Sequence, residues 1–330
     1  IEGKLDEVRL KGLERLREGY VKNRLVPKPD QPFNLKELQD RYQLLLSDPL
    51  ISRMNGRILP GTKPGNSILD VDVTRAKPYQ LSLFGNNQRP PSIGAEAFGV
   101  NGIVRNLTGL GDTLDFNFTL SEGSKRYAGG FSLPITDSGT QVFFRFDEGD
   151  SLVIEDPFTD IDIKSQVHNL EGGISHPFIN TLNQHLTMGA MLAVRVNETS
   201  GPGGPVSYVP GLSNARNQAT VWRLFQEYNQ RWEKQVVALR STFSVGMNAL
   251  GATPELNSNN PDSEFFAWLG QGQFAWRLLD NGAQMVLRGN LQLSDEALLP
   301  LERIAVGGFY TVRGYRENQL VRDQGYSVSA

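Results

Sequence analysis

The most distinctive chemical setting in this sequence belongs to Arg313, which lies between apolar neighbours in the run Val312, Arg313, Gly314, Tyr315. The surrounding segment, about residues 295–324, lies between two strand-like stretches and is far longer than a hairpin turn of two to about five residues. A guanidinium can bind a carboxylate through paired donors in a fixed geometry. We predict a loop that folds into the protein, with Arg313 paired to a carboxylate there. The alternative is a surface loop whose arginine extends to solvent.

No set of residues matches an enzyme active site. The sequence has no Gly-x-Ser-x-Gly motif and no phosphate-binding loop, and Gly109-Leu110-Gly111 is too short for a dinucleotide-binding signature. There is no cysteine, and the three histidines, His168, His176 and His185, lack the spacing of a metal site. We therefore predict no catalytic residue, no metal site and no cofactor.

Charge and hydropathy exclude two further classes of protein. The formal net charge is −3, from 33 Lys and Arg against 36 Asp and Glu, so no basic surface for nucleic acid is expected. No run of eighteen apolar residues occurs, which excludes a transmembrane helix but not a transmembrane β-barrel. The chain opens without a signal segment, so an exported protein would be present here in mature or shortened form.

Residues 1–78 are predicted to form a small α+β unit in the order β-α-α-β-β. Residues 4–11 alternate with period two, and Asn34 with Glu37 three positions later marks a helix N-terminus. Two further strands are expected near residues 51–59 and 68–74. One face of the second helix is apolar and includes Leu38, Tyr42, Leu45 and Leu46.

From Tyr79 onward, one strand-length segment of alternating apolar and polar residues follows another. Several exceed ten residues, whereas soluble strands average about five or six and membrane strands need about nine to eleven. An arginine facing lipid near the midplane would cost about 2–4 kcal/mol. Because all four of the following arginines fall on the polar face, we assign that face to the lumen of a barrel: Arg145, Arg195, Arg240 and Arg288.

The connections also indicate an outer-membrane barrel, because short turns alternate with long polar loops. A soluble β-sandwich or propeller is the alternative, and the strand lengths disfavour it. We count eleven strands before the Arg313 loop and the start of a twelfth at Gly325. An open edge is not tolerated in lipid, so we expect these strands to be part of a larger barrel.

Five stretches carry a family resemblance: residues 34–39, 70–79, 86–94, 104–112 and 307–318. They resemble the two-partner secretion family of outer-membrane transporters, the hemolysin and filamentous-haemagglutinin secretion/activation proteins. The first 78 residues resemble the POTRA domain nearest the membrane. Residues 86–94 and 104–112 resemble the first barrel hairpin with its following turn, and the Val-Arg-Gly-Tyr segment resembles the sixth extracellular loop.

The resemblance implies a mainly β fold, with a membrane-proximal POTRA domain at 1–78 and part of a transmembrane antiparallel β-barrel at 79–330. The family has about sixteen strands, preceded by a plug helix, a linker and a first POTRA domain, so the N-terminal parts and strands twelve to sixteen are expected to be missing or incomplete here. The aspartate that pairs with the loop arginine in the family would lie beyond Ala330.

The resemblance also implies a function, the export of an unfolded adhesin- or hemolysin-type exoprotein from periplasm to cell surface without nucleotide hydrolysis. A monomer in outer-membrane lipid is expected, with its POTRA domain in the periplasm. That domain would capture the extended exoprotein by β-augmentation. The groove candidates are Leu38, Tyr42, Leu45 and Leu46, with core packing as the alternative role for most of them.

Two other functions stay open at this point. A barrel-assembly insertase shares the POTRA-plus-barrel plan and the Arg-Gly-Tyr loop. A passive porin is the other, although the N-terminal unit and the apolar loop both argue against it.

The predicted pairing of Arg313 has a direct test. The substitution Arg313→Ala should reduce exoprotein secretion and leave insertion of the barrel intact, because it removes the loop contact and no wall residue. Secretion and outer-membrane protein level are measured together. Normal secretion by this variant at a normal protein level would contradict the prediction.

Overall fold

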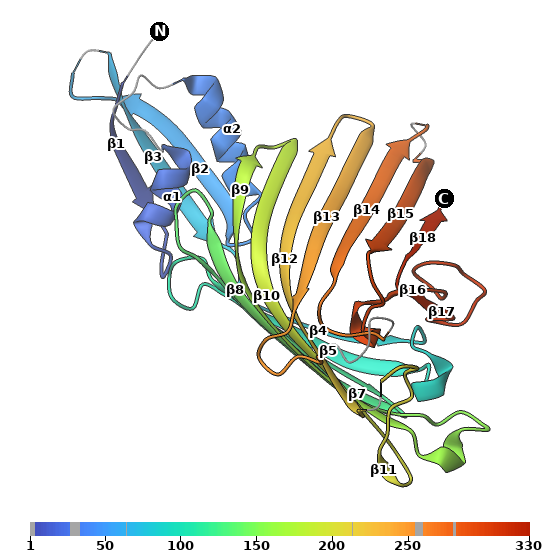
Figure 1. The fold of residues 1–330 in the computed structure, drawn as a ribbon. Coiled ribbons are helices and arrows are strands. Elements are labelled where there is room, and N and C mark those ends of the chain that lie inside the picture. Colours follow the sequence, from blue (N-terminus) through green and yellow to red (C-terminus); the bar gives the residue numbers. More distant parts are fainter. Residues whose placement is uncertain (1–3, 27–33, 64, 213, 255–259, 280–281) are drawn as a thin grey trace.

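The computed structural model describes residues 4–26, 34–63, 65–212, 214–254, 260–279 and 282–330. The chain forms a small α+β unit followed by a large curved antiparallel sheet (Figure 1). Within the described ranges, no helix has both the length and the apolar character needed to cross a membrane.

The N-terminal unit has the predicted order β-α-α-β-β. Asn34 caps the second helix by accepting a hydrogen bond from the backbone N–H of Lys36 at 2.9 Å. The sheet has the order β1-β3-β2, with β1 parallel and β2 antiparallel to the central strand. The helices cover one face of this sheet, over a core that includes Val21, Leu25 and Val71. Its elements are β1 (Lys4–Lys11), α1 (Glu18–Leu25), α2 (Leu35–Leu46), β2 (Ile51–Pro60) and β3 (Asn66–Arg75).

Within the described residues, the large sheet contains eleven wall strands before the long loop and a twelfth after it, which confirms the predicted count. All neighbouring pairs are antiparallel, and β4 and β18 form the two edges of the sheet. The strands are β4 (Tyr79–Asn86), β5 (Ala97–Arg105), β6 (Thr113–Ser121), β7 (Ser124–Pro134), β8 (Gln141–Leu152), β9 (Lys164–Asn180), β10 (Gln184–Gly201), β12 (Arg216–Arg231), β13 (Gln235–Met247), β14 (Phe266–Arg277), β15 (Gln284–Ser294) and β18 (Gly325–Ser329). Strand β11 (Gly204–Pro205) pairs only with the end of β10.

One face of the large sheet is apolar and exposed. The period-two alternation places Phe116, Phe144 and Leu224 on this face, each 45–53% exposed. An apolar surface that extends over so many strands is expected to contact a membrane. The strands are also long enough to cross one, since β9, β10 and β12 contain 17, 18 and 16 residues.

The N-terminal unit docks on the turn between β5 and β6. The backbone N–H of Arg17 donates to the carbonyl of Gly109 at 3.1 Å, and the Arg15 guanidinium donates to the carbonyl of Leu107 at 3.3 Å. A Cβ at Gly111 would lie 2.3 Å from the Tyr20 ring, so this close approach requires glycine. These contacts place the N-terminal unit at the rim of short turns.

Asp112 holds the turn in shape from within. Its side chain is fully buried and accepts the backbone N–H groups of Leu107 at 3.0 Å and Thr108 at 2.8 Å. Burial alone would raise the pKa of this carboxyl, but the hydrogen bonds from Thr108 and Leu107 outweigh burial and lower the pKa. Its stabilisation is therefore present above the unfolded pKa of about 3.9 and is lost as pH falls through the lower folded value.

We expect Asp112→Ala to destabilise the turn by about 1–3 kcal/mol, because two buried amide donors lose their acceptor. Hydrogen exchange of the peptide that contains Leu107 and Thr108 should become faster. Asp137→Ala is the matched control, because Asp137 makes a single exposed contact to Asn23 at the same rim. Equal exchange rates in Asp112→Ala and in the unaltered protein would contradict the role of Asp112.

Candidate functional site

The segment between β15 and β18 is an ordered loop with secondary structure of its own. It contains the short helix η3 (Pro300–Glu302) and the strands β16 (Ile304–Val306) and β17 (Leu320–Arg322), which pair antiparallel. In Figure 1 this pair lies beside β18. We call residues 298–306 and 320–324 the loop base, and residues 307–319 the loop tip.

Glu302 joins the loop base to the polar face of the wall. Its carboxylate accepts hydrogen bonds from Arg223 of β12 at 2.6 and 2.9 Å and from Arg195 of β10 at 3.1 Å. The Arg195 guanidinium also donates to the carbonyl of Leu301. On the other side of Arg223, a guanidinium nitrogen lies 3.6 Å from a carboxylate oxygen of Glu171 on β9. Two cations and two carboxylates therefore form one network with balanced charge.

The two limbs of the loop base are held together by further polar contacts. The side-chain amide of Gln292 donates to the carbonyls of Glu302 and Asp323, each at 3.0 Å. Asp323 in turn accepts from the Arg303 guanidinium and from the backbone N–H of Leu298, each at 3.0 Å. Leu298 is fully buried. Hydrogen bonds therefore hold the two limbs of the loop base together against the wall.

The loop tip contacts distant parts of the chain with exposed side chains. The Tyr310 hydroxyl donates to Gln88 at 2.8 Å, in the connection between β4 and β5. Arg316 lies 2.8 Å from Glu155, in the connection between β8 and β9. Both partners belong to the rim opposite the N-terminal unit, so the tip reaches across the concave side of the sheet.

Arg313 lies in the tip with its guanidinium 5.5 Å from the centre of the Phe309 ring. Its neighbours Val312, Gly314 and Tyr315 are exposed, Tyr315 to 65%. Among the described residues, no carboxylate lies within ion-pair distance of Arg313. Its pairing with a wall carboxylate therefore stays a prediction.

The four arginines that we assigned to the lumen lie on the polar face of the sheet. Arg145 is opposite Glu171 in the register of β8 and β9. Arg240 forms an ion pair with Glu227 at 2.9 Å. Arg240 and Arg288 also line a cleft of about 410 Å³ together with Tyr310 and Thr311 of the loop tip. Arg195, the fourth, binds the loop base at Glu302 as described above.

The main residues of the contact between the loop base and the wall, Arg223 and Glu302, are not predicted by the sequence patterns. Arg223 alternates with the exposed residues Trp222 and Leu224, a pattern that could have placed it on the polar face with the other arginines. Glu302 follows Pro300 and Leu301 in a segment without alternation. One feature of the sequence could have indicated a carboxylate such as Glu302. Several arginines fall on the polar face, and their charges require carboxylates to balance them.

The groove residues predicted on α2 fall into two groups. Leu38 and Leu45 are 8% and 4% exposed and belong to the core, as in the core-packing alternative. Leu46 is 39% exposed, and Tyr42 lies half-buried with its ring over Gly56 of β2. Of these four residues, Tyr42 and Leu46 are therefore the accessible ones, and Tyr42 lies over β2, which is an edge strand of its sheet.

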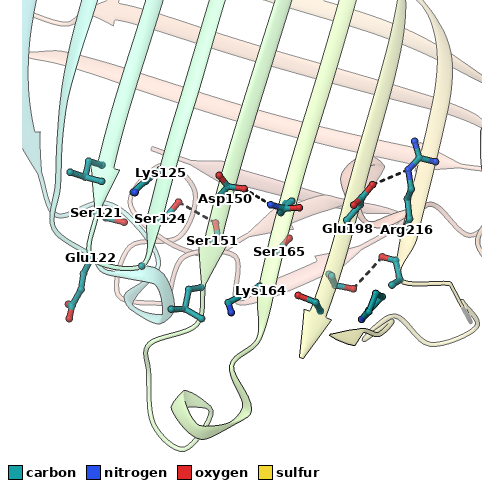
Figure 2. Close-up of a pocket in the computed structure, with 18 residues that line it drawn as sticks. Ser121, Glu122, Ser124, Lys125, Asp150, Ser151, Lys164, Ser165, Glu198 and Arg216 are labelled. Carbon is teal, nitrogen blue, oxygen red and sulfur yellow. Dashed lines mark hydrogen bonds and ion pairs between the residues drawn. The ribbon is translucent and has the colours of Figure 1, made fainter. Parts of the chain in front are cut away.

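A second polar surface lies where the wall strands reach the rim opposite the N-terminal unit. It borders a cleft of about 720 Å³ (Figure 2). Five side chains follow one another in register across β7, β8, β9, β10 and β12: Lys125, Asp150, Gln166, Glu198 and Arg216. The Arg216–Glu198 pair is 3.0 Å apart. The row contains two cations, two carboxylates and one amide, so it has no net charge and marks a solvated rim rather than an anion site.

Within the part of the chain that the structure describes, no three His, Asp or Glu side chains group as a metal site. The features that do stand out are a membrane-length antiparallel wall, an apolar outer face, a polar inner face and a long loop bound to it. Together with the N-terminal α+β unit, they define a POTRA-plus-barrel protein of the outer-membrane type.

The chain belongs to the haemolysin secretion/activation protein ShlB/FhaC/HecB family, whose model matches residues 65–329. It is 21% identical over 343 aligned positions to the outer membrane transporter CdiB of Dickeya dadantii (strain 3937), an alignment that covers 98% of this chain and 58% of that protein. The chain thus spans about three-fifths of the length of the relatives that it matches.

Solved structures show the same fold. CdiB from Escherichia coli superposes with a TM-score of 0.80 at 20% identity, over 99% of this chain and 61% of that one. BamA from Haemophilus ducreyi lacking POTRA domains 1–3 gives a TM-score of 0.61 at 11% identity, over 96% and 61%.

Two glycines of the loop tip allow a controlled test of its packing. Gly307 has φ = 125°, and an added Cβ would lie 2.4 Å from the Arg316 carbonyl oxygen, whereas Gly314 has φ = 89° and open space around it. Alanine should cost about 1–2 kcal/mol of backbone strain at either position. Only Gly307→Ala should also displace the tip, seen as increased mobility of a nitroxide label at Gln319→Cys, an exposed position of the tip. Equal label mobility in the two variants would show that the tip is not packed as described.

Proposed function

We propose that this protein is an outer-membrane pore that exports an unfolded partner exoprotein of the adhesin or hemolysin type from the periplasm to the cell surface. Family membership and the likeness to CdiB transporters support this function. The proposed transport is non-enzymatic, needs no nucleotide and is carried out by a monomer surrounded by outer-membrane lipid, with the POTRA unit in the periplasm.

The main structural support for this proposal is that the POTRA unit and the loop tip lie at opposite rims of the sheet. The POTRA unit docks on the rim of short turns through Gly109, and the loop tip contacts the opposite rim at Gln88 and Glu155. Between them lies a face rich in arginines and carboxylates, which suits a hydrated passage. A chain that enters beside the POTRA unit would meet the loop before it reached the cell surface.

The first contact with the exoprotein is proposed at the edge of β2. An extended segment can add to this edge as a new strand, held by main-chain hydrogen bonds. Tyr42 lies over this strand, and Leu46 follows it four residues later on the same helix face, so both would receive an apolar side chain of the segment. Leu38 and Leu45 are excluded from that role, because they are packed in the core.

The competing function, insertion of other barrel proteins into the outer membrane, is separated from export by one deletion. Loss of the gene should abolish surface appearance of a single large exoprotein, expected to be encoded next to it, and leave other outer-membrane proteins at their normal levels. A general loss of outer-membrane proteins would instead indicate an insertase and would contradict the proposed export.

Capture on the POTRA unit is tested with a matched pair of substitutions on α2. Leu46→Asp places a charge beside the β2 edge and should reduce secretion several-fold, because burying an unpaired carboxylate against an apolar side chain is unfavourable. Gln43→Asp adds the same charge at an exposed position of the same helix and should leave secretion unchanged. Normal secretion by Leu46→Asp, with normal protein levels for both variants, would contradict this capture site.

A further inference from the structure

The base and the tip of the long loop are held in very different ways. At the base, the Glu302 side chain is 5% exposed and Arg223 is 12% exposed. At the tip, the residues of the ion pair Arg316–Glu155 are 64% and 29% exposed. Water screens exposed ion pairs and competes for their hydrogen bonds, so the tip contacts are far easier to break than those of the base.

The base contact also depends on charge balance. Arg195 and Arg223 both reach Glu302, which places two cations close together in a poorly solvated site. Glu171, at 3.6 Å from Arg223, carries one negative charge and can balance only one of these two cations. Removing the charge of Glu302 would leave two guanidinium groups facing each other, a strongly unfavourable arrangement.

We propose that Glu302 is a positioning residue, the fixed pivot by which the wall holds the loop while the tip moves. The wall residues Arg195 and Arg223 come from β10 and β12, which are hydrogen-bonded neighbours and form a rigid support. Gln292 and Asp323 connect this pivot to both limbs of the base. Release of Tyr310 and Arg316 would therefore swing the tip without detaching the loop.

This role is separate from the predicted pairing of Arg313. Arg313 belongs to the tip, whereas Glu302 binds the wall eleven positions earlier with partners that are all present in this chain. The pivot also does not depend on which substrate crosses the pore. The role of Glu302 can therefore be tested without an exoprotein. A negative result for Glu302 and a negative result for the proposed export are thus distinguishable.

The test measures accessibility of the loop base in the full-length protein in outer membranes. This sequence has no cysteine, so Ala305→Cys in β16 reports the base and Tyr315→Cys reports the tip. Maleimide labelling rates are compared for the unaltered background, Glu302→Gln, and the control Glu317→Gln. Glu317 is a tip carboxylate that accepts the backbone N–H of Phe309 within the loop.

With Glu302→Gln, labelling at position 305 should become at least about five-fold faster, a change of about 1 kcal/mol in the opening equilibrium. Glu317→Gln should leave the rate at position 305 unchanged. An unchanged rate in Glu302→Gln would overturn the pivot, as would an equal increase with Glu317→Gln.

If Glu302→Gln alone does not insert, the double variant Glu302→Gln/Arg223→Gln provides the same reading. It removes one cation with the carboxylate, so it should insert at a normal level and still label faster at position 305. Labelling of the double variant at the background rate would overturn the proposal.

Discussion

The ion pairs between Glu302 and the wall arginines Arg195 and Arg223 are the interaction on which the arrangement of this protein depends. They attach the loop base to the polar face of the sheet at β10 and β12, beside the contacts of Gln292 on β15. With them, its base becomes part of the wall, and only its tip contacts the remote rim. The loop therefore combines a buried, charge-balanced attachment with exposed, weaker ones.

The wall itself follows from a simple constraint on strands in lipid. Apolar residues must face outward and every backbone group must be paired, so long antiparallel strands with period two are required. The polar residues are then directed inward, where arginines such as Arg145 and Arg240 find carboxylates on neighbouring strands. The lipid requires one face of the sheet to be apolar and leaves the polar residues on the other face. This polar face supplies the partners for the loop.

This constraint explains how much the sequence alone could predict. The strand count and the β-α-α-β-β unit follow from local periodicity, and both are confirmed. The attachment of Glu302 to the wall does not follow from local periodicity. Its partners lie 79 and 107 positions away in the sequence, and Glu302 itself lies in a segment without alternation. On α2, periodicity identified one apolar face, but only the packing against β2 separates the buried Leu38 and Leu45 from the accessible Leu46.

Family membership defines the class of protein, and the contacts of Glu302 explain how the loop is held in this chain. The attachment of the loop base is tested most directly by an electron cryomicroscopy structure of the complete protein in lipid nanodiscs. In that structure, the Glu302 carboxylate should lie within hydrogen-bond distance of both Arg195 and Arg223, with the loop base against β10 and β12. A loop base that lies outside the barrel, with Arg195 and Arg223 facing an open pore, would contradict it.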